Sequence, residues 1–119
     1  MKVAINGFGR IGRAAFKIAL EQGIQVVAIN DVHGPKDAQY LLKYDSVYGR
    51  YNKDVKISGD DLVVNRKKIK ILQERDPEKL PWKNLGVSIV IESTGAFRDK
   101  KEAGKHIKAG AKYVLISAP

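Results

Sequence analysis

Residues 2–31 read KVAINGFGRIGRAAFKIALEQGIQVVAIND, and this stretch decides the fold of the chain. Residues 2–6 have the apolar composition of a short buried strand and are followed by a glycine. From Arg10 the apolar residues fall at helical spacing, and Gly23 is well placed as the residue just beyond the helix end. Residues 24–29 form a second apolar run. The stretch therefore predicts a strand–helix–strand unit with a right-handed crossover.

A glycine-rich turn, Gly7-Phe8-Gly9-Arg10-Ile11-Gly12, joins the first strand to the helix. A G-x-G-x-x-G motif in this context is typical of a dinucleotide-binding turn. Gly7 permits the tight turn, Gly9 lets the backbone approach a pyrophosphate, and Gly12 allows close packing of helix and strand. The helix N-terminus adds N–H groups and about half a positive charge. The turn thus predicts a pyrophosphate site, and the alternative is a structural turn whose glycines serve packing only.

Asp31 ends the second strand and lies 19 residues after Gly12. Rossmann-type domains place here an acidic side chain that accepts hydrogen bonds from the adenosine ribose. The same carboxylate would oppose the extra phosphate of NADP, because like unit charges 4 Å apart repel by about 4 kcal/mol at an effective dielectric constant of 20. His33 and Lys36 are close enough in sequence to soften that repulsion, so dual specificity stays open. A turn-forming or capping role is the alternative interpretation of Asp31.

The rest of the chain continues to alternate helices and strands. Helices are expected over 35–44, 77–81 and 99–109, strands over 69–72, 87–91 and 113–116, and a hairpin over 55–57 and 62–64 around Gly59-Asp60-Asp61. Asp76 is expected to cap the second of these helices, and Asp99 with Glu102 resembles a capping box for the third. The alternation predicts an α/β fold, a Rossmann-type open parallel sheet of five main strands with helices on both faces and an added antiparallel hairpin.

The composition narrows the class of protein. The chain has 119 residues, which is room for one domain, and no cysteine, which excludes disulfides, thiolate zinc sites and a cysteine nucleophile within it. No run approaches the 18 apolar residues of a membrane helix, and no signal peptide precedes the first strand, so a cytoplasmic protein is expected. The net charge of +9 comes from scattered lysines and is interpreted as a solvated surface, with nucleic-acid binding unlikely.

Several motifs, taken in order, make the chain similar to the phosphorylating glyceraldehyde-3-phosphate dehydrogenase family. The resemblance covers essentially all of the chain. It rests on AINGFGRIGR (4–13), AIND (28–31), YLLKYDS (40–46), ERDP with PW (74–77, 81–82), ESTG (92–95) and ISAP (116–119). One departure is local, since Arg66 follows Asn65 where relatives often carry glycine in a hairpin turn.

The resemblance implies that the cofactor is NAD and assigns residues to it. It places Asn6, Gly7, Phe8, Gly9, Arg10 and Ile11 around the pyrophosphate, Asn30 and Asp31 at the adenosine ribose, Glu74 and Arg75 at the adenine edge, Ser93, Thr94, Gly95 and Phe97 along the far side of the groove, and Ser117 and Ala118 towards the nicotinamide. Spacing alone would favour a structural role for three of these residues, as polar residues that end buried strands: Ser93, Thr94 and Ser117. The side chain of Phe97 would then simply pack against its neighbours.

The resemblance also implies what this stretch lacks. In the family a cysteine nucleophile and its histidine base follow the segment similar to residues 117–119, together with the next strand of the cofactor domain. We therefore expect residues 1–119 to be a single, incomplete dinucleotide-binding domain without catalytic residues, which binds NAD and catalyses nothing alone. His33 and His106 are expected to be solvated surface residues, and no cluster has metal-ligand spacing. The parent would be a homotetramer that oxidises glyceraldehyde 3-phosphate with NAD and phosphate through a thioester.

Three alternatives stay open. An erythrose-4-phosphate dehydrogenase would have a similar cofactor domain, although glutamate would be expected there in place of Asp31. A nucleic-acid binder would use the basic surface, with affinity that falls steeply with salt. An interaction module would use the 113–116 strand as an open apolar edge, which invites strand pairing. The chain would then be an edge-paired dimer, and it would be a monomer if the edge stays unpaired.

Overall fold

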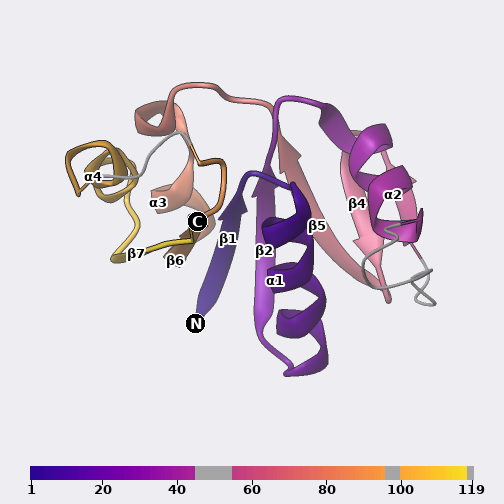
Figure 1. The fold of residues 1–119 in the computed structure, drawn as a ribbon. Coiled ribbons are helices and arrows are strands. Elements are labelled where there is room, and N and C mark those ends of the chain that lie inside the picture. The colour runs from indigo at the N-terminus through magenta and orange to yellow at the C-terminus, as the bar shows by residue number, and fades with distance from the viewer. Residues whose placement is uncertain (45–54, 96–99, 118–119) are drawn as a thin grey trace.

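The computed structural model describes residues 1–44, 55–95 and 100–117 and shows one open sheet flanked by helices (Figure 1). The strands are β1 (Lys2–Asn6), β2 (Gln25–Asn30), β3 (Val55–Ser58), β4 (Asp61–Val64), β5 (Lys67–Leu72), β6 (Val87–Glu92) and β7 (Tyr113–Ile116). The helices are α1 (Arg10–Glu21), α2 (Gly34–Tyr44), the 3-10 turn η1 (Pro77–Lys79), α3 (Trp82–Leu85) and α4 (Lys100–Lys108).

The seven strands follow the order β3-β4-β5-β2-β1-β6-β7 across the sheet. The pairs β5–β2, β2–β1, β1–β6 and β6–β7 are parallel, whereas β3–β4 and β4–β5 are antiparallel. This arrangement confirms the predicted sheet of five parallel strands with an added hairpin. In the register, Asn6 of β1 lies opposite both Asn30 of β2 and Glu92 of β6, so the polar ends of the three central strands meet at one edge.

Two hydrophobic cores lie on opposite faces of the sheet because neighbouring residues of a strand point to opposite sides. On β1, Ile5 packs with Phe16 of α1 and Leu42 of α2 in one core. Its neighbour Ala4 packs with Trp82 of α3 and other residues in the second core. Helices therefore cover both faces, as the alternating pattern predicted.

The element boundaries follow the expected local signals. Gly23 adopts a φ of +73° one residue beyond the α1 cap, and Asp76 accepts a hydrogen bond from the Glu78 N–H at the start of η1. The helix α3 was not predicted, because four residues are too few to show a periodic pattern. The expected start of α4 at Asp99, with its capping box, lies outside the described residues.

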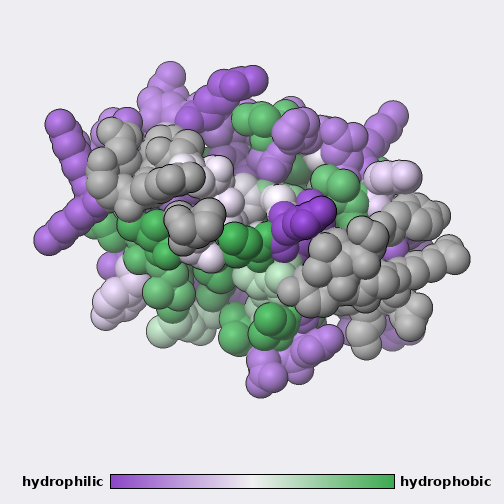
Figure 2. Space-filling view, in the orientation of Figure 1, coloured by the Kyte–Doolittle hydropathy of each residue, from purple (hydrophilic) through white to green (hydrophobic). Residues whose placement is uncertain are grey.

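The strand β7 lies at the end of the sheet and pairs only with β6 among the described strands. Its residues Tyr113 and Leu115 are about 60% exposed. Figure 2 shows hydrophobic surface on the side of the molecule where β6 and β7 lie, and hydrophilic side chains projecting around the periphery. No helix in the described ranges is long and apolar enough to cross a membrane.

Candidate functional site

A cleft of about 360 Å³ opens at the carboxyl ends of β1, β2 and β6. Ligands of open α/β sheets bind at this edge, outside the carboxyl ends of the strands. Most of the predicted cofactor residues line the cleft: Asn6, Gly7, Phe8, Gly9, Asn30, Asp31, Glu74, Arg75, Ser93 and Thr94. The fold thus brings together residues from four separate motifs of the sequence.

The other predicted residues are placed differently. Arg10 and Ile11 begin α1 directly after the turn, and Gly95 and Ser117 do not line the cleft. Phe97 and Ala118 lie outside the described residues. Two lining residues, Val32 and His33, were not predicted as part of the site. Their position directly after Asp31 is the sequence signal that could have identified them.

The three glycines of the turn have different structural roles. Gly7 has a φ of +95°, and a Cβ there would lie 2.8 Å from the backbone nitrogen of Thr94. A Cβ on Gly12 would collide with the carbonyl oxygen of Gly7. Gly9 lines the cleft, and apart from its neighbours in the chain no described residue has an atom within 4 Å of the place where its Cβ would be. Gly7 and Gly12 are therefore needed for the fold, while the missing side chain of Gly9 leaves open space for a ligand.

The N-terminus of α1 presents backbone donors beside this space. The Arg13 N–H is bonded to the Gly9 carbonyl at 2.9 Å, so the N–H groups of the three preceding helical residues have no partner within the helix. The first turn of α1 contains no acidic residue, and its N-cap, Gly9, has no side chain to cap it. Such an uncapped helix start suits a negatively charged diphosphate.

Asp31 is held in place by three hydrogen bonds. Its Oδ2 accepts from the Phe8 N–H at 2.7 Å, and its Oδ1 accepts from the His33 N–H at 3.0 Å and from His33 Nδ1 at 2.7 Å. Burial is the largest single influence on the Asp31 carboxyl and acts to raise its pKa. The hydrogen bonds from Phe8 and His33 together outweigh burial and hold the pKa below its ordinary value. Asp31 is therefore an ionised acceptor at neutral pH.

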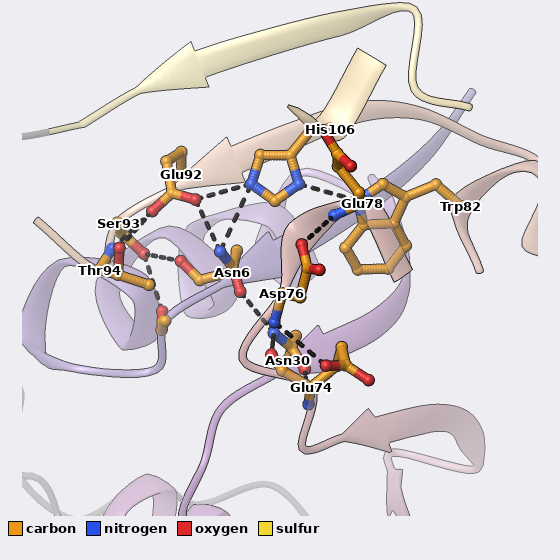
Figure 3. Close-up of polar contacts among 11 residues, drawn as sticks. Asn6, Asn30, Glu74, Asp76, Glu78, Trp82, Glu92, Ser93, Thr94 and His106 are labelled. Carbon is orange, nitrogen blue, oxygen red and sulfur yellow. Dashed lines mark hydrogen bonds and ion pairs between the residues drawn. The ribbon is translucent and has the colours of Figure 1, made fainter. Parts of the chain in front are cut away.

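Asn30 connects three segments at the base of the cleft (Figure 3). Its Nδ2 donates to Asn6 Oδ1 at 2.7 Å and to the Glu74 carbonyl at 2.8 Å. Its Oδ1 accepts from the Glu74 N–H at 2.9 Å. The Asn30 amide thus ties the end of β2 to β1 and to the loop that follows β5.

Glu92 lies at the end of β6 and is only 1% exposed. Its Oε1 accepts from Asn6 Nδ2 at 2.6 Å and from His106 Nε2 at 2.7 Å. Its Oε2 accepts from the Thr94 N–H at 3.0 Å and from the Thr94 hydroxyl at 2.6 Å. Burial is the largest influence and acts to raise the pKa of Glu92, but the donors His106, Thr94 and Asn6 together lower it below its ordinary value.

The expectation that His106 is a solvated surface residue is wrong, because its side chain is fully buried. Trp82 Nε1, which can only donate, lies 3.0 Å from His106 Nδ1, so Nδ1 is an acceptor. His106 is therefore neutral, and Nε2 carries the proton that is donated to Glu92. Ala103 and Ala109 are also buried, and their three-residue spacing from His106 is the helical signal that could have predicted this burial. His33, in contrast, is exposed as expected.

Ser93 and Thr94 have structural partners as well as a place in the cleft. The Ser93 hydroxyl donates to the Gly7 carbonyl at 2.8 Å and lies 3.1 Å from the Asn6 carbonyl. Thr94 is bonded to Glu92 through its backbone and its side chain. Ser93 therefore stabilises the glycine turn across a long separation in sequence, whereas Thr94 holds the Glu92 carboxylate.

The described residues of the cleft supply acceptors for hydroxyl groups and donors for phosphate groups. They include no cysteine, and no group of histidine, aspartate and glutamate side chains that could hold a metal ion occurs in the described ranges. The arrangement can bind and orient a dinucleotide.

Comparison with known proteins gives a consistent result. A family model described as the NAD binding domain of glyceraldehyde 3-phosphate dehydrogenase matches residues 1–100. Glyceraldehyde-3-phosphate dehydrogenase of Geobacillus stearothermophilus is 54% identical over 120 residues, which cover 100% of this chain and 36% of the relative. The protein of the same name from Borreliella burgdorferi is 54% identical over 124 residues, which cover 100% of this chain and 37% of the relative. Glyceraldehyde-3-phosphate dehydrogenase 1 of Trichoderma koningii is 52% identical over 120 residues, which cover 99% of this chain and 36% of the relative. The chain spans about a third of the length of these relatives.

Proposed function

The chain belongs to the glyceraldehyde-3-phosphate dehydrogenase family, in which it matches the NAD-binding domain, and from this premise we propose that residues 1–119 form a single domain that binds NAD in the cleft. The observation that carries the proposal is the open space at Gly9 beside an uncapped helix start, with Asp31 lining the same cleft.

The residues present fit the chemical groups of NAD. The N–H groups at the start of α1 would bind the pyrophosphate, because Gly9 leaves the backbone accessible. Asp31 would accept hydrogen bonds from the hydroxyl groups of the adenosine ribose, and Glu74 and Arg75 would line the adenine side of the cleft. The far side of the cofactor would be bordered by Ser93, Thr94, Gly95 and Phe97, and the path towards the nicotinamide by Ser117 and Ala118.

For the whole protein we infer the oxidation of glyceraldehyde 3-phosphate with NAD and phosphate, in the cytoplasm and as a homotetramer. NAD, when bound, supplies the hydride acceptor. The part of the work done by this chain is to hold and orient the cofactor. Because residues 1–119 contain no cysteine nucleophile, this polypeptide alone should produce no NADH from the aldehyde. NADH formation by the pure chain would contradict that inference.

A pairing of this chain with a second copy is supported by the exposed apolar edge at β7. Tyr113 and Leu115 are more than half exposed on a strand that pairs on one side among the described strands. Open apolar edges favour strand pairing. Sedimentation at increasing concentration would detect a dimer, and a monomer throughout the range would count against edge pairing.

Calorimetric titration of the chain with NAD tests the proposal, with Gly9→Ser as the site variant. Gly9 has a φ of −75°, which any residue adopts, and serine is favoured at a helix N-cap, so the variant should remain as stable as the parent. Its side chain would occupy the space proposed for the pyrophosphate, and NAD affinity should fall at least about tenfold, or 1.4 kcal/mol.

Gly104→Ser is the matched control. Gly104 lies in α4 and does not line the cleft, and outside its own helix backbone and chain neighbours no described residue has an atom within 4 Å of its Cβ position, so this variant should bind NAD as the parent does. If the folded parent did not bind NAD, or if Gly9→Ser bound it equally well, the proposed site would be wrong.

A further inference from the structure

We propose that His33 controls how strongly this chain prefers NAD over NADP, and that it makes this preference weaken as the pH falls. The proposal rests on the proposed function and deepens it, because it assigns a specificity-determining role to a residue beside Asp31. It is carried by the direct contact between the two side chains, in which His33 Nδ1 lies 2.7 Å from Asp31 Oδ1.

The contact uses acceptor positions that a ribose would need. An ionised carboxylate has about four lone-pair positions. Three are occupied, by the Phe8 N–H, the His33 N–H and the His33 imidazole. A ribose diol offers two hydroxyl donors, so binding both at Asp31 requires the imidazole to leave. The His33 side chain is 68% exposed, which makes its displacement into solvent sterically simple.

Protonation of His33 keeps this contact and strengthens it. Because ionised Asp31 can only accept, Nδ1 of neutral His33 must carry the hydrogen, and Nε2 is the atom that gains a proton. The hydrogen bond from a neutral imidazole to the ionised carboxylate then becomes an ion pair between a cation and an anion, which is stronger because the two opposite charges attract. Protonated His33 should therefore resist displacement by the ribose and should also offset the negative charge of Asp31.

His33 lies among several charged side chains. It lines both the main cleft and a smaller adjoining cavity of about 140 Å³. The charged groups that line these spaces with it are Arg13, Asp31, Asp37, Glu74 and Arg75. Histidine is the side chain whose charge normally changes between pH 5 and 8, whereas arginine and ionised carboxylates keep theirs. Protonation of the His33 imidazole therefore adds one positive charge beside Asp31.

The two cofactors should respond in opposite directions. NAD must displace His33 to reach Asp31 with both hydroxyls, so its affinity should fall when His33 is protonated. NADP carries a phosphate on the ribose, which Asp31 repels and a histidine cation attracts. The ratio of the dissociation constant for NADP to that for NAD should consequently fall by about tenfold from pH 8 to pH 5.5, equivalent to about 1.4 kcal/mol.

The experiment measures both dissociation constants by calorimetry at pH 8 and pH 5.5, in the parent chain, in His33→Ala and in Lys36→Ala. The His33→Ala variant is essential because a phosphate monoester itself takes up a proton near pH 6, which would reduce repulsion without any help from the protein. The Lys36→Ala control removes an exposed positive charge three residues further along the chain.

The proposal expects the tenfold fall in the parent and in Lys36→Ala, and a clearly smaller fall in His33→Ala. An equal fall in the parent and in His33→Ala would assign the effect to the phosphate and overturn the role of His33, while leaving NAD binding intact. A constant ratio in the parent would overturn it as well. Failure of the folded chain to bind NAD at pH 8 would instead overturn the proposed function on which the inference rests.

Discussion

The substitution Glu92→Gln should destabilise the domain by about 3 kcal/mol, because the buried carboxylate accepts hydrogen bonds from four donors that cannot all be served by an amide. Glutamine offers one oxygen and one NH₂ group. With its oxygen towards Asn6 and His106, its NH₂ group faces Thr94. The Thr94 hydroxyl can rotate to accept, but the Thr94 backbone N–H cannot, and it loses its partner.

The neighbours cannot rearrange to relieve this loss. An amide flip of Asn6 would break its bond from Asn30, and His106 Nδ1 is already occupied by Trp82. One unsatisfied buried donor costs about 1–3 kcal/mol, and the surviving bonds each weaken by about 1 kcal/mol once the acceptor is neutral. Removing a buried charge offsets part of this cost. The sum is about 3 kcal/mol, which should leave a domain of typical stability, roughly 5–15 kcal/mol, still folded.

Urea denaturation, followed by circular dichroism, measures the effect. Glu78→Gln is the matched control, because Glu78 is 43% exposed and its partner Lys108 is 3.6 Å away, a surface pair that contributes less than about 1 kcal/mol. The difference between the stability losses of the two variants gives the effect of burial and hydrogen bonding at Glu92, separated from the effect of changing glutamate to glutamine. If Glu92→Gln lost no more stability than Glu78→Gln, Glu92 would not be the fully satisfied buried anion described above.

Three further predictions concern the backbone and pH. Arg66 has a φ of +68°, so Arg66→Gly should raise the free energy of unfolding by about 1 kcal/mol, and an unchanged urea midpoint would contradict strain there. Gly7→Ala should destabilise the chain by more than about 1 kcal/mol. A positive φ alone costs a residue with a Cβ about 1 kcal/mol, and the Cβ of alanine would also press on the Thr94 backbone. A variant that unfolds at or above the temperature of the parent would refute this prediction. The pKa values of Asp31 and Glu92 lie below their ordinary values of 3.8 and 4.5, so their contribution to stability should be full above about pH 4.5 and should be lost as the pH drops further. The urea midpoint measured against pH should show this fall, and the fall should be shallower in Asp31→Asn.

The alternation of strands and helices could be predicted because its signals are local. A buried strand, a glycine turn and a helical spacing of apolar residues are each contained within a few neighbouring residues. The two-sided core followed from the same pattern, since strands that are apolar on both sides need helices on both faces. Prediction was incomplete only where an element was too short for a period, as in α3.

The hydrogen-bond partners of His106 could not be predicted from its surroundings in the chain. Its helix carries several lysines, which suggest a solvated surface, yet its partners Trp82 and Glu92 come from other elements. Which groups a buried histidine meets depends on which segments pack against its face of the helix, and that is a property of tertiary structure.

The sequence by itself determined the fold class, the glycine turn and the acidic residue after the second strand, because each depends on backbone conformation or on order along the chain. Only the tertiary structure decided which polar groups meet at the cleft. It placed Glu92 between Asn6 and His106, which are 86 and 14 residues away in the sequence. It also placed the His33 imidazole against Asp31. The physical reason is that hydrogen bonds and charges act over a few ångströms in space, so their partners are set by the packing of the sheet and helices.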